Sequence, residues 1–103
     1  MVKSYALKIL PIVYSDLKKA KKWYQNKNAE LAEDFKTQVN KEIDYIEKYP
    51  ENYQRKYKEL RQALVTRFPY AIFNLVEEEK KSIVIFGVLH TSRNPEIIRK
   101  RLF

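Results

Sequence analysis

The sequence predicts a single α+β domain over residues 1–103, with the element order β-α-α-β-β-β and a short C-terminal helix. Two observations lead to this prediction. After one short strand-like run, hydrophobic residues recur at helical spacing up to residue 49, and from residue 60 they follow strand-like runs instead. The connections are short, so we expect a helical hairpin packed on a four-stranded, mainly antiparallel sheet.

The first strand is predicted at Tyr5 to Ile9, where apolar residues alternate around Lys8 and the run ends at Pro11. We expect Ser15 to cap the helix that follows, in which apolar residues recur every three or four positions. The other face of this helix carries a lysine run, which we expect to be solvated; the alternative is that it contacts ribosomal RNA or DNA. The apolar positions are Leu17, Ala20, Trp23 and Tyr24, all assigned to packing, and the lysines are Lys18, Lys19, Lys21 and Lys22.

A second, longer helix is predicted from about Ala29 to Tyr49, after a break at Asn26-Lys27-Asn28. Pro50 ends it, because the residue before a proline is pushed out of the helical region. Residues 51–59 are polar and aromatic without a clear period, so we expect a loop or a ragged helical turn. The apolar stripe of the helix consists of Ala32, Phe35, Val39, Ile43, Ile46 and Tyr49.

Three strands are predicted after residue 59, at Leu60 to Val65, Tyr70 to Val76 and Ser82 to Leu89. The last run is apolar at nearly every position, so we expect it to lie inside the sheet with both faces covered. Gly87 within it indicates a bulge or a close approach of another segment. Asn94-Pro95-Glu96 is a typical helix start, which predicts a C-terminal helix over residues 95–102.

Composition excludes several classes of protein. Zero cysteine excludes a disulfide framework, a thiolate zinc site and a cysteine nucleophile, and we expect no metal site. A single glycine leaves no room for a glycine-rich phosphate loop, so we expect no nucleotide cofactor. No apolar run is long enough to cross a bilayer and residues 1–10 lack the features of a signal peptide, so we expect a cytoplasmic protein with no membrane partner.

Basic residues outnumber acidic ones by 21 to 13, and the formal net charge is +8. This charge favours polyanionic partners, although solubility alone is the simpler explanation. All six arginines lie between Arg55 and Arg101, whereas ten of the fifteen lysines lie in the first 50 residues. Because the planar guanidinium suits phosphate and carboxylate, we interpret the second half as the working surface; the alternative is that its arginines form surface ion pairs.

Three segments in this half resemble those of a known group of proteins. They are Leu60-Arg61, Arg67-Phe68-Pro69-Tyr70-Ala71-Ile72-Phe73 and Val88-Leu89-His90-Thr91-Ser92-Arg93-Asn94-Pro95. Together with the βααβββ order, they resemble the RelE/ParE superfamily, the toxins of bacterial type II toxin–antitoxin modules. The resemblance covers nearly the whole chain. It implies plasmid stabilisation or growth arrest as the role, and a cognate antitoxin that is acidic, folds on binding and neutralises the toxin.

The superfamily divides by target. RelE-like members are ribosome-dependent endoribonucleases that cut messenger RNA, often with a C-terminal Tyr or His, whereas ParE-like members poison DNA gyrase. This chain has no tyrosine after Tyr70, and its Val88-Leu89-His90-x-x-Arg93 segment is closer to the ParE pattern. The resemblance therefore favours a ParE-like toxin acting on gyrase. The alternatives are an mRNA interferase acting with the ribosome, and an inactive toxin fold that binds nucleic acid.

A metal-independent ribonuclease would need an acid, a base and fixed cations around one phosphate. Under that alternative the catalytic residues would be Arg61, His90 and Arg93, with His90 suited to proton transfer because its ordinary pKa is near ~6.5. We expect the arginines, including Arg67, to converge on one phosphate. Further phosphate-binding candidates are Lys56 and Lys58.

The C-terminal segment is the candidate surface for protein partners. If the chain acts on gyrase, we expect its toxicity to depend on surface contacts that include this segment. We expect the acidic, amphipathic antitoxin segment to bury against the sheet and the helical hairpin, with its carboxylates on the arginines. The candidate partner-binding residues are Ile97, Arg99, Arg101, Leu102 and Phe103. Apolar grooves and the high charge also predict a homodimer or aggregation of the chain alone.

Overall fold

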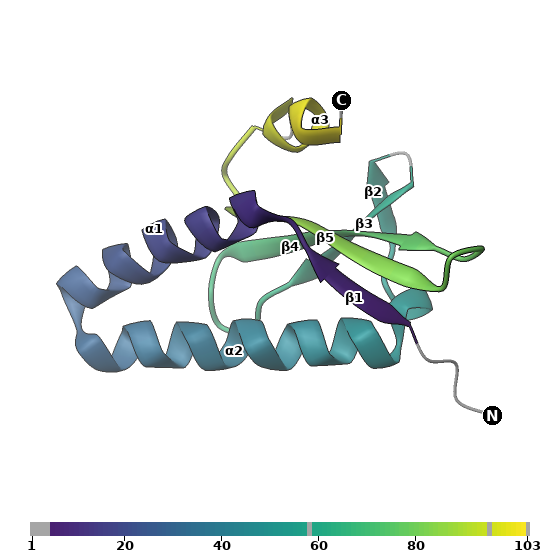
Figure 1. The fold of residues 1–103 in the computed structure, drawn as a ribbon. Helices are drawn as coiled ribbons and strands as arrows, with labels where there is room; N and C mark the ends of the chain where they lie inside the picture. The colour runs from purple at the N-terminus through teal and green to yellow at the C-terminus, as the bar shows by residue number, and fades with distance from the viewer. Residues whose placement is uncertain (1–4, 58, 95, 103) are drawn as a thin grey trace.

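The chain forms one sheet with helices on both of its faces (Figure 1). The structure is a computed structural model that describes residues 5–57, 59–94 and 96–102. Its elements are β1 (Ala6–Ile9), α1 (Pro11–Lys27), α2 (Ala29–Lys48), a 3-10 helix (Pro50–Asn52), β2 (Arg55–Tyr57), β3 (Leu60–Leu64), β4 (Tyr70–Glu77), β5 (Ser82–His90) and α3 (Glu96–Leu102).

The strand order in the sheet is β1-β5-β4-β3-β2. The β1–β5 pair is parallel and the other three pairs are antiparallel. The hairpin of α1 and α2 lies along one face, and the short α3 lies over the other (Figure 1). The predicted α+β class, the element order and the mainly antiparallel sheet are confirmed.

Helix α1 begins five residues earlier than predicted. Leu10 is its N-cap residue and Pro11 its first residue, so the prediction that Ser15 caps this helix is wrong. Proline is favoured at the first helical position because its fixed φ suits the helix and its missing N–H has no partner to lose there. At the other end, Asn28 separates the two helices and caps α2, since its Oδ1 accepts a hydrogen bond from the N–H of Glu30 at 2.8 Å.

The main core lies between the helical hairpin and the sheet. Tyr24, Phe35 and Phe68 meet at its centre, with ring centroids 5.1–5.3 Å apart. The predicted stripe of α2 is buried here except for Tyr49, which is exposed at the helix end. The buried stripe residues are Ala32, Phe35, Val39, Ile43 and Ile46.

A fifth strand, β2, occupies part of the segment that we expected to be a loop or helical turn. It adds to the edge of β3, and the N–H of Gln62 also donates to the carbonyl of Gln54 at 3.1 Å. The side chain of Arg61 holds the chain just before β2, because its Nη1 donates to the carbonyl of Tyr53 at 2.6 Å. Pairing with a neighbouring strand, which local periodicity does not encode, makes this segment extended.

Strand β5 has neighbours on both sides and is buried on both faces, as predicted. The pairing with β4 shifts by one residue at Phe86, which is the bulge predicted near Gly87. Gly87 is also a point of close approach, because a Cβ atom there would lie 2.6 Å from Ile98 Cδ1 of α3. Helix α3 is capped by Asn94, whose Oδ1 accepts from the N–H of Glu96 at 3.0 Å.

Candidate functional site

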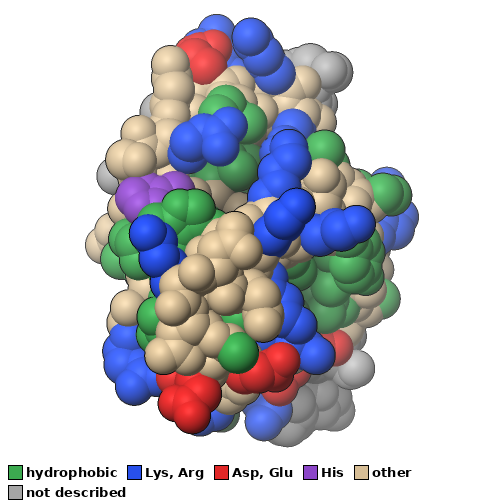
Figure 2. All heavy atoms as spheres, turned by 90° about the vertical axis from the view of Figure 1, so that its left-hand side faces the viewer, with side chains coloured by type: hydrophobic (Ala, Val, Ile, Leu, Met, Phe, Trp, Pro, Cys, Tyr) green, Lys and Arg blue, Asp and Glu red, His purple; other side chains and the backbone are tan. Residues whose placement is uncertain are grey.

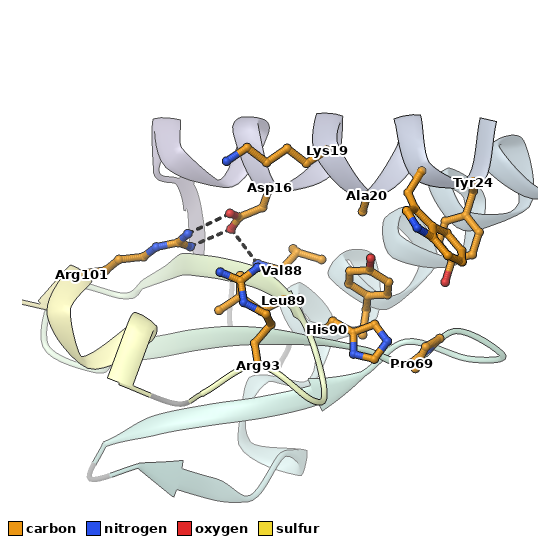
Figure 3. A pocket seen from close by; sticks show the side chains of 12 residues that line it. Asp16, Lys19, Ala20, Tyr24, Pro69, Val88, Leu89, His90, Arg93 and Arg101 are labelled. Atoms are coloured by element: carbon orange, nitrogen blue, oxygen red, sulfur yellow. Dashed lines mark hydrogen bonds and ion pairs between the residues drawn. The ribbon is translucent and has the colours of Figure 1, made fainter. Parts of the chain in front are cut away.

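A cavity of about 430 Å³ opens between α1 and the C-terminal half of β5 (Figure 3). This volume falls within the range of about 300–1,000 Å³ that is usual for small-molecule sites. We call it the α1–β5 cavity and define it by its lining residues. They are Asp16, Lys19, Ala20, Trp23, Tyr24, Pro69, Tyr70, Val88, Leu89, His90, Arg93 and Arg101.

One wall of the cavity is a nearly buried ion pair. Arg101 of α3 donates from Nη1 and Nη2 to the two carboxylate oxygens of Asp16 on α1, at 2.6 and 2.8 Å. The two side chains are only 17% and 8% exposed. Asp16 also accepts from the N–H of Val88 at 3.1 Å (Figure 3). Arg101 donates to the carbonyl of Phe86 at 3.1 Å as well. The pair thereby ties α3, α1 and the edge of β5 together.

Aromatic rings form the opposite wall. Trp23 is 55% exposed, so its assignment to packing is only partly right, although its ring contacts that of Tyr24 edge-on at 5.0 Å. Burial raises the pKa of Tyr24 above its usual value, and it also raises the pKa of Tyr70, which the nearby Arg93 guanidinium partly opposes. Both phenols therefore stay protonated at neutral pH and act as hydrogen-bond donors rather than as bases.

His90 lies at the end of β5 with its ring against Tyr70, at a centroid distance of 5.3 Å. Its Nδ1 is 3.1 Å from the backbone N–H of Ser92 and 2.8 Å from the Ser92 hydroxyl. A backbone N–H can only donate, so Nδ1 is an acceptor and the neutral ring carries its proton on Nε2. In this state the free ring nitrogen is a donor and not a general base.

Cationic side chains complete the cavity. Lys19 projects from α1, and Arg93 extends from the loop after β5 into the space beside Val88 (Figure 3). Lys and Arg side chains gather across the middle of the face in Figure 2, and acidic side chains lie toward its ends. Because Asp16 is already neutralised by Arg101, Lys19 and Arg93 leave the cavity positively charged.

Arg61, the third predicted catalytic residue, lies elsewhere. It lines a second cavity of about 370 Å³ with Arg55 and Glu59, and neither His90 nor Arg93 lines that cavity. Arg61 is opposite Asn74 of β4, whereas His90 is opposite Tyr70, four residues away along the same strand. At about 3.3 Å per residue this is roughly 13 Å. The structure therefore brings His90 and Arg93 together and separates Arg61 from them.

The phosphate-binding candidates do not join that group either. Arg67 is in the β3–β4 turn with a positive φ of 69°, and its guanidinium lies 3.7 Å from Asp34 of α2. The expected convergence of the arginines on one phosphate is therefore not found. Lys58 lies outside the described residues, and the structure does not describe the side chain of Lys56.

The predicted partner-binding residues of α3 have different environments. Ile97 is half-buried, and Arg99 is exposed and pairs with Glu96 at 2.8 Å. Arg101 faces inward and forms an ion pair with Asp16, so its guanidinium is not available to a partner protein. The structure does not describe the Leu102 side chain, and Phe103 lies outside the described residues.

Sequence reasoning missed the cavity residues of α1, above all Asp16. One signal was available, because Asp16 is the only acidic residue among the first 29 and it stands beside a lysine run. The described part of the chain holds no group of three or more His, Cys, Asp or Glu residues that could bind a metal ion. It also contains no helix that is long and apolar enough to cross a membrane.

Comparisons with known proteins give one family match and a similar fold among solved structures. Residues 7–95 match the family model described as the ParE toxin of the type II toxin–antitoxin system parDE. A solved structure from a chromosomal ParDE toxin–antitoxin system of P. aeruginosa has a similar fold, with a TM-score of 0.75 and 16% sequence identity. The similarity covers 85% of this chain and 97% of that one. No curated protein sequence matches this chain.

Proposed function

The chain belongs to the family of ParE toxins of type II toxin–antitoxin systems, and we propose that it arrests growth in the cytoplasm by acting on DNA gyrase. We further propose that a cognate antitoxin neutralises it. The family match over residues 7–95 is the observation that carries this proposal. By the resemblance described above, ParE-like toxins poison gyrase and do not cut RNA.

The geometry of the candidate catalytic residues favours gyrase over messenger RNA as the target. A metal-independent ribonuclease needs its acid, base and cations around one phosphate. Here Arg61 and His90 line different cavities, and His90 Nδ1 is engaged by Ser92. Tyr70, the tyrosine beside His90, is held in its protonated form. None of these residues is poised as a base for the ribose hydroxyl.

The proposed antitoxin is acidic and folds on the toxin, because this chain carries a net charge of +8. We place part of the contact on α3, where Ile97 and Arg99 are accessible, and include the neighbouring Leu102 and Phe103 in this proposal. Leu64, at the end of β3, is 59% exposed and extends the apolar area on the same face of the sheet. A homodimer through this face is the competing arrangement for the free toxin.

The experiment that tests the target uses two purified systems at one protein concentration, chosen because it stops growth when the chain is expressed. We expect inhibited supercoiling and trapped cleavage complexes with gyrase, and an intact messenger in a translation system mapped by primer extension. Codon-register cuts that disappear with His90→Ala would instead establish the ribonuclease. Expression without a growth defect would leave only the inactive nucleic-acid-binding fold.

Neutralisation is tested by co-expression with the gene adjacent to that of the toxin. We expect growth to recover and the two proteins to purify together. Charge reversal at Arg99, by Arg99→Glu, should weaken the complex, whereas the same change at Lys36 on the exposed side of α2 should not. Equal effects of the two changes would remove α3 from the proposed interface.

A further inference from the structure

Strand β1 pairs with only the first part of the edge of β5. The parallel pairing with β1 runs only from Ser82 to Ile85, and the chain then leaves the sheet after Leu10 donates to the carbonyl of Ile85 at 3.2 Å. Among the described residues, no strand continues along 86–90 on this side, where α1 lies instead. This stretch of edge forms one side of the α1–β5 cavity.

Two side chains occupy the first part of this open edge. Arg101 donates to the carbonyl of Phe86, and Asp16 accepts from the N–H of Val88. Because backbone groups alternate between the two sides of an antiparallel strand, the carbonyl of Val88 and the N–H of His90 face the same side as the Val88 N–H. On that side, the described residues offer neither group a hydrogen-bond partner.

The free part of this edge therefore offers one hydrogen-bond acceptor, the carbonyl of Val88, and one donor, the N–H of His90. The carbonyl of His90 is already used by the N–H of Arg93 at 2.9 Å, which ends the edge. An added peptide strand would find a single pair of hydrogen bonds, too few to hold it. A planar base needs one acceptor and one donor side by side, which is what Val88 and His90 present.

The surroundings of this donor–acceptor pair suit the rest of a nucleotide. Trp23 lines the cavity and is more than half exposed, with Lys27 Nζ over its ring at 5.1 Å from the centroid, and we assign the stacking of the base to this ring. Ala20 of α1 is small enough to leave room beside the strand. Lys19 and Arg93 supply the positive charge for a phosphate. Aromatic rings next to unpaired cations are typical of sites that bind single-stranded nucleic acid.

We propose that the α1–β5 cavity binds a nucleoside phosphate, with the base on the backbone of Val88 and His90 and the phosphate on Lys19 and Arg93. The source is either a free nucleotide or one nucleotide of a single strand, since both present the same groups. Every common base carries a donor beside an acceptor, so binding tolerates all bases. This property goes beyond action on gyrase and neutralisation by an antitoxin, and it is measured without either partner.

Trp23 is the only tryptophan of the chain, so its fluorescence reports directly on the cavity. The full-length protein is titrated with three probes: AMP, a short single-stranded oligodeoxyadenylate and inorganic phosphate. We expect quenching by the oligonucleotide that weakens with added salt. Quenching by AMP as well identifies free nucleotides as a source, and its absence identifies the strand. Inorganic phosphate should not quench.

Matched variants test the site. Arg93→Gln and Lys19→Gln should each weaken binding about tenfold, since each removes a charge-assisted contact. Lys36→Gln removes the same charge from an exposed site on α2 and should leave binding unchanged. Circular dichroism confirms that each variant is folded. The proposal would be overturned if neither AMP nor the oligonucleotide quenched the fluorescence, or if inorganic phosphate quenched it as strongly as they do. It would also be overturned if Lys36→Gln lost as much affinity as Arg93→Gln and Lys19→Gln.

Discussion

Replacing Asp16 by alanine should destabilise this protein more than any exposed charge substitution. The change removes both hydrogen bonds to Arg101, at 2.6 and 2.8 Å, and leaves the N–H of the buried Val88 without its acceptor. Removing one partner of a buried ion pair costs roughly 3–5 kcal/mol. Arg101 remains 17% exposed, so water reaches it in part, and we expect the lower end, about 3 kcal/mol.

Urea denaturation measures this loss as a change in the free energy of unfolding. Asp34→Ala is the matched control, because it breaks the 3.7 Å pair with Arg67 in which both side chains are more than half exposed; it should cost about 0.5 kcal/mol. Asp16→Ala with Arg101→Met should cost less than the sum of the single changes, by about 1–2 kcal/mol. Equal losses for Asp16→Ala and Asp34→Ala, or strict additivity, would refute the proposed stabilising role of the buried pair.

Two further predictions concern the contact between Gly87 and α3, and the stability of the fold at alkaline pH. Gly87→Ala places a Cβ atom 2.6 Å from Ile98 and 2.7 Å from Arg101, so it should loosen α3 at a cost of about 1–3 kcal/mol and speed amide exchange there; unchanged exchange in α3 would contradict this. Burial, aided by a hydrogen bond to Glu42, raises the pKa of Tyr53 above its usual value in the folded state. Above about pH 10 the unfolded chain loses this proton first, so stability falls as pH rises. Tyr53→Phe should make that fall shallower, which urea midpoints between neutral and alkaline pH will show; an identical pH dependence in the variant would exclude this cause.

Most elements follow from local sequence, because a helix or strand needs a periodic apolar face. The stripe from Ala32 to Ile46 predicts α2, and the unbroken apolar run before His90 predicts a strand covered on both faces. Two features escaped this reasoning. Pro11 opens α1 although Ser15 is the better N-cap residue by type, and β2 forms because the edge of β3 is available to it.

The candidate site could be predicted only in part. His90 and Arg93 are three residues apart in the chain, so the sequence alone predicts that they lie close together. The position of Arg61 depends on the register of β3 against β4, which pairs it with Asn74 and so separates it from His90. This register depends on the geometry of the β3–β4 turn, where Arg67 has a positive φ, and the apolar runs of the two strands do not by themselves specify that turn.

Family, charge and the set of chemical groups can be read from the residues alone: one histidine, one tryptophan and arginines confined to the second half. Which of these groups lie in contact depends on the folded chain. Asp16 and Arg101 are 85 residues apart in the chain, and their pairing arises because α3 packs on β5 where Gly87 leaves space. Contacts at such separations depend on the packing of complete elements, whereas periodicity and capping act over a few residues.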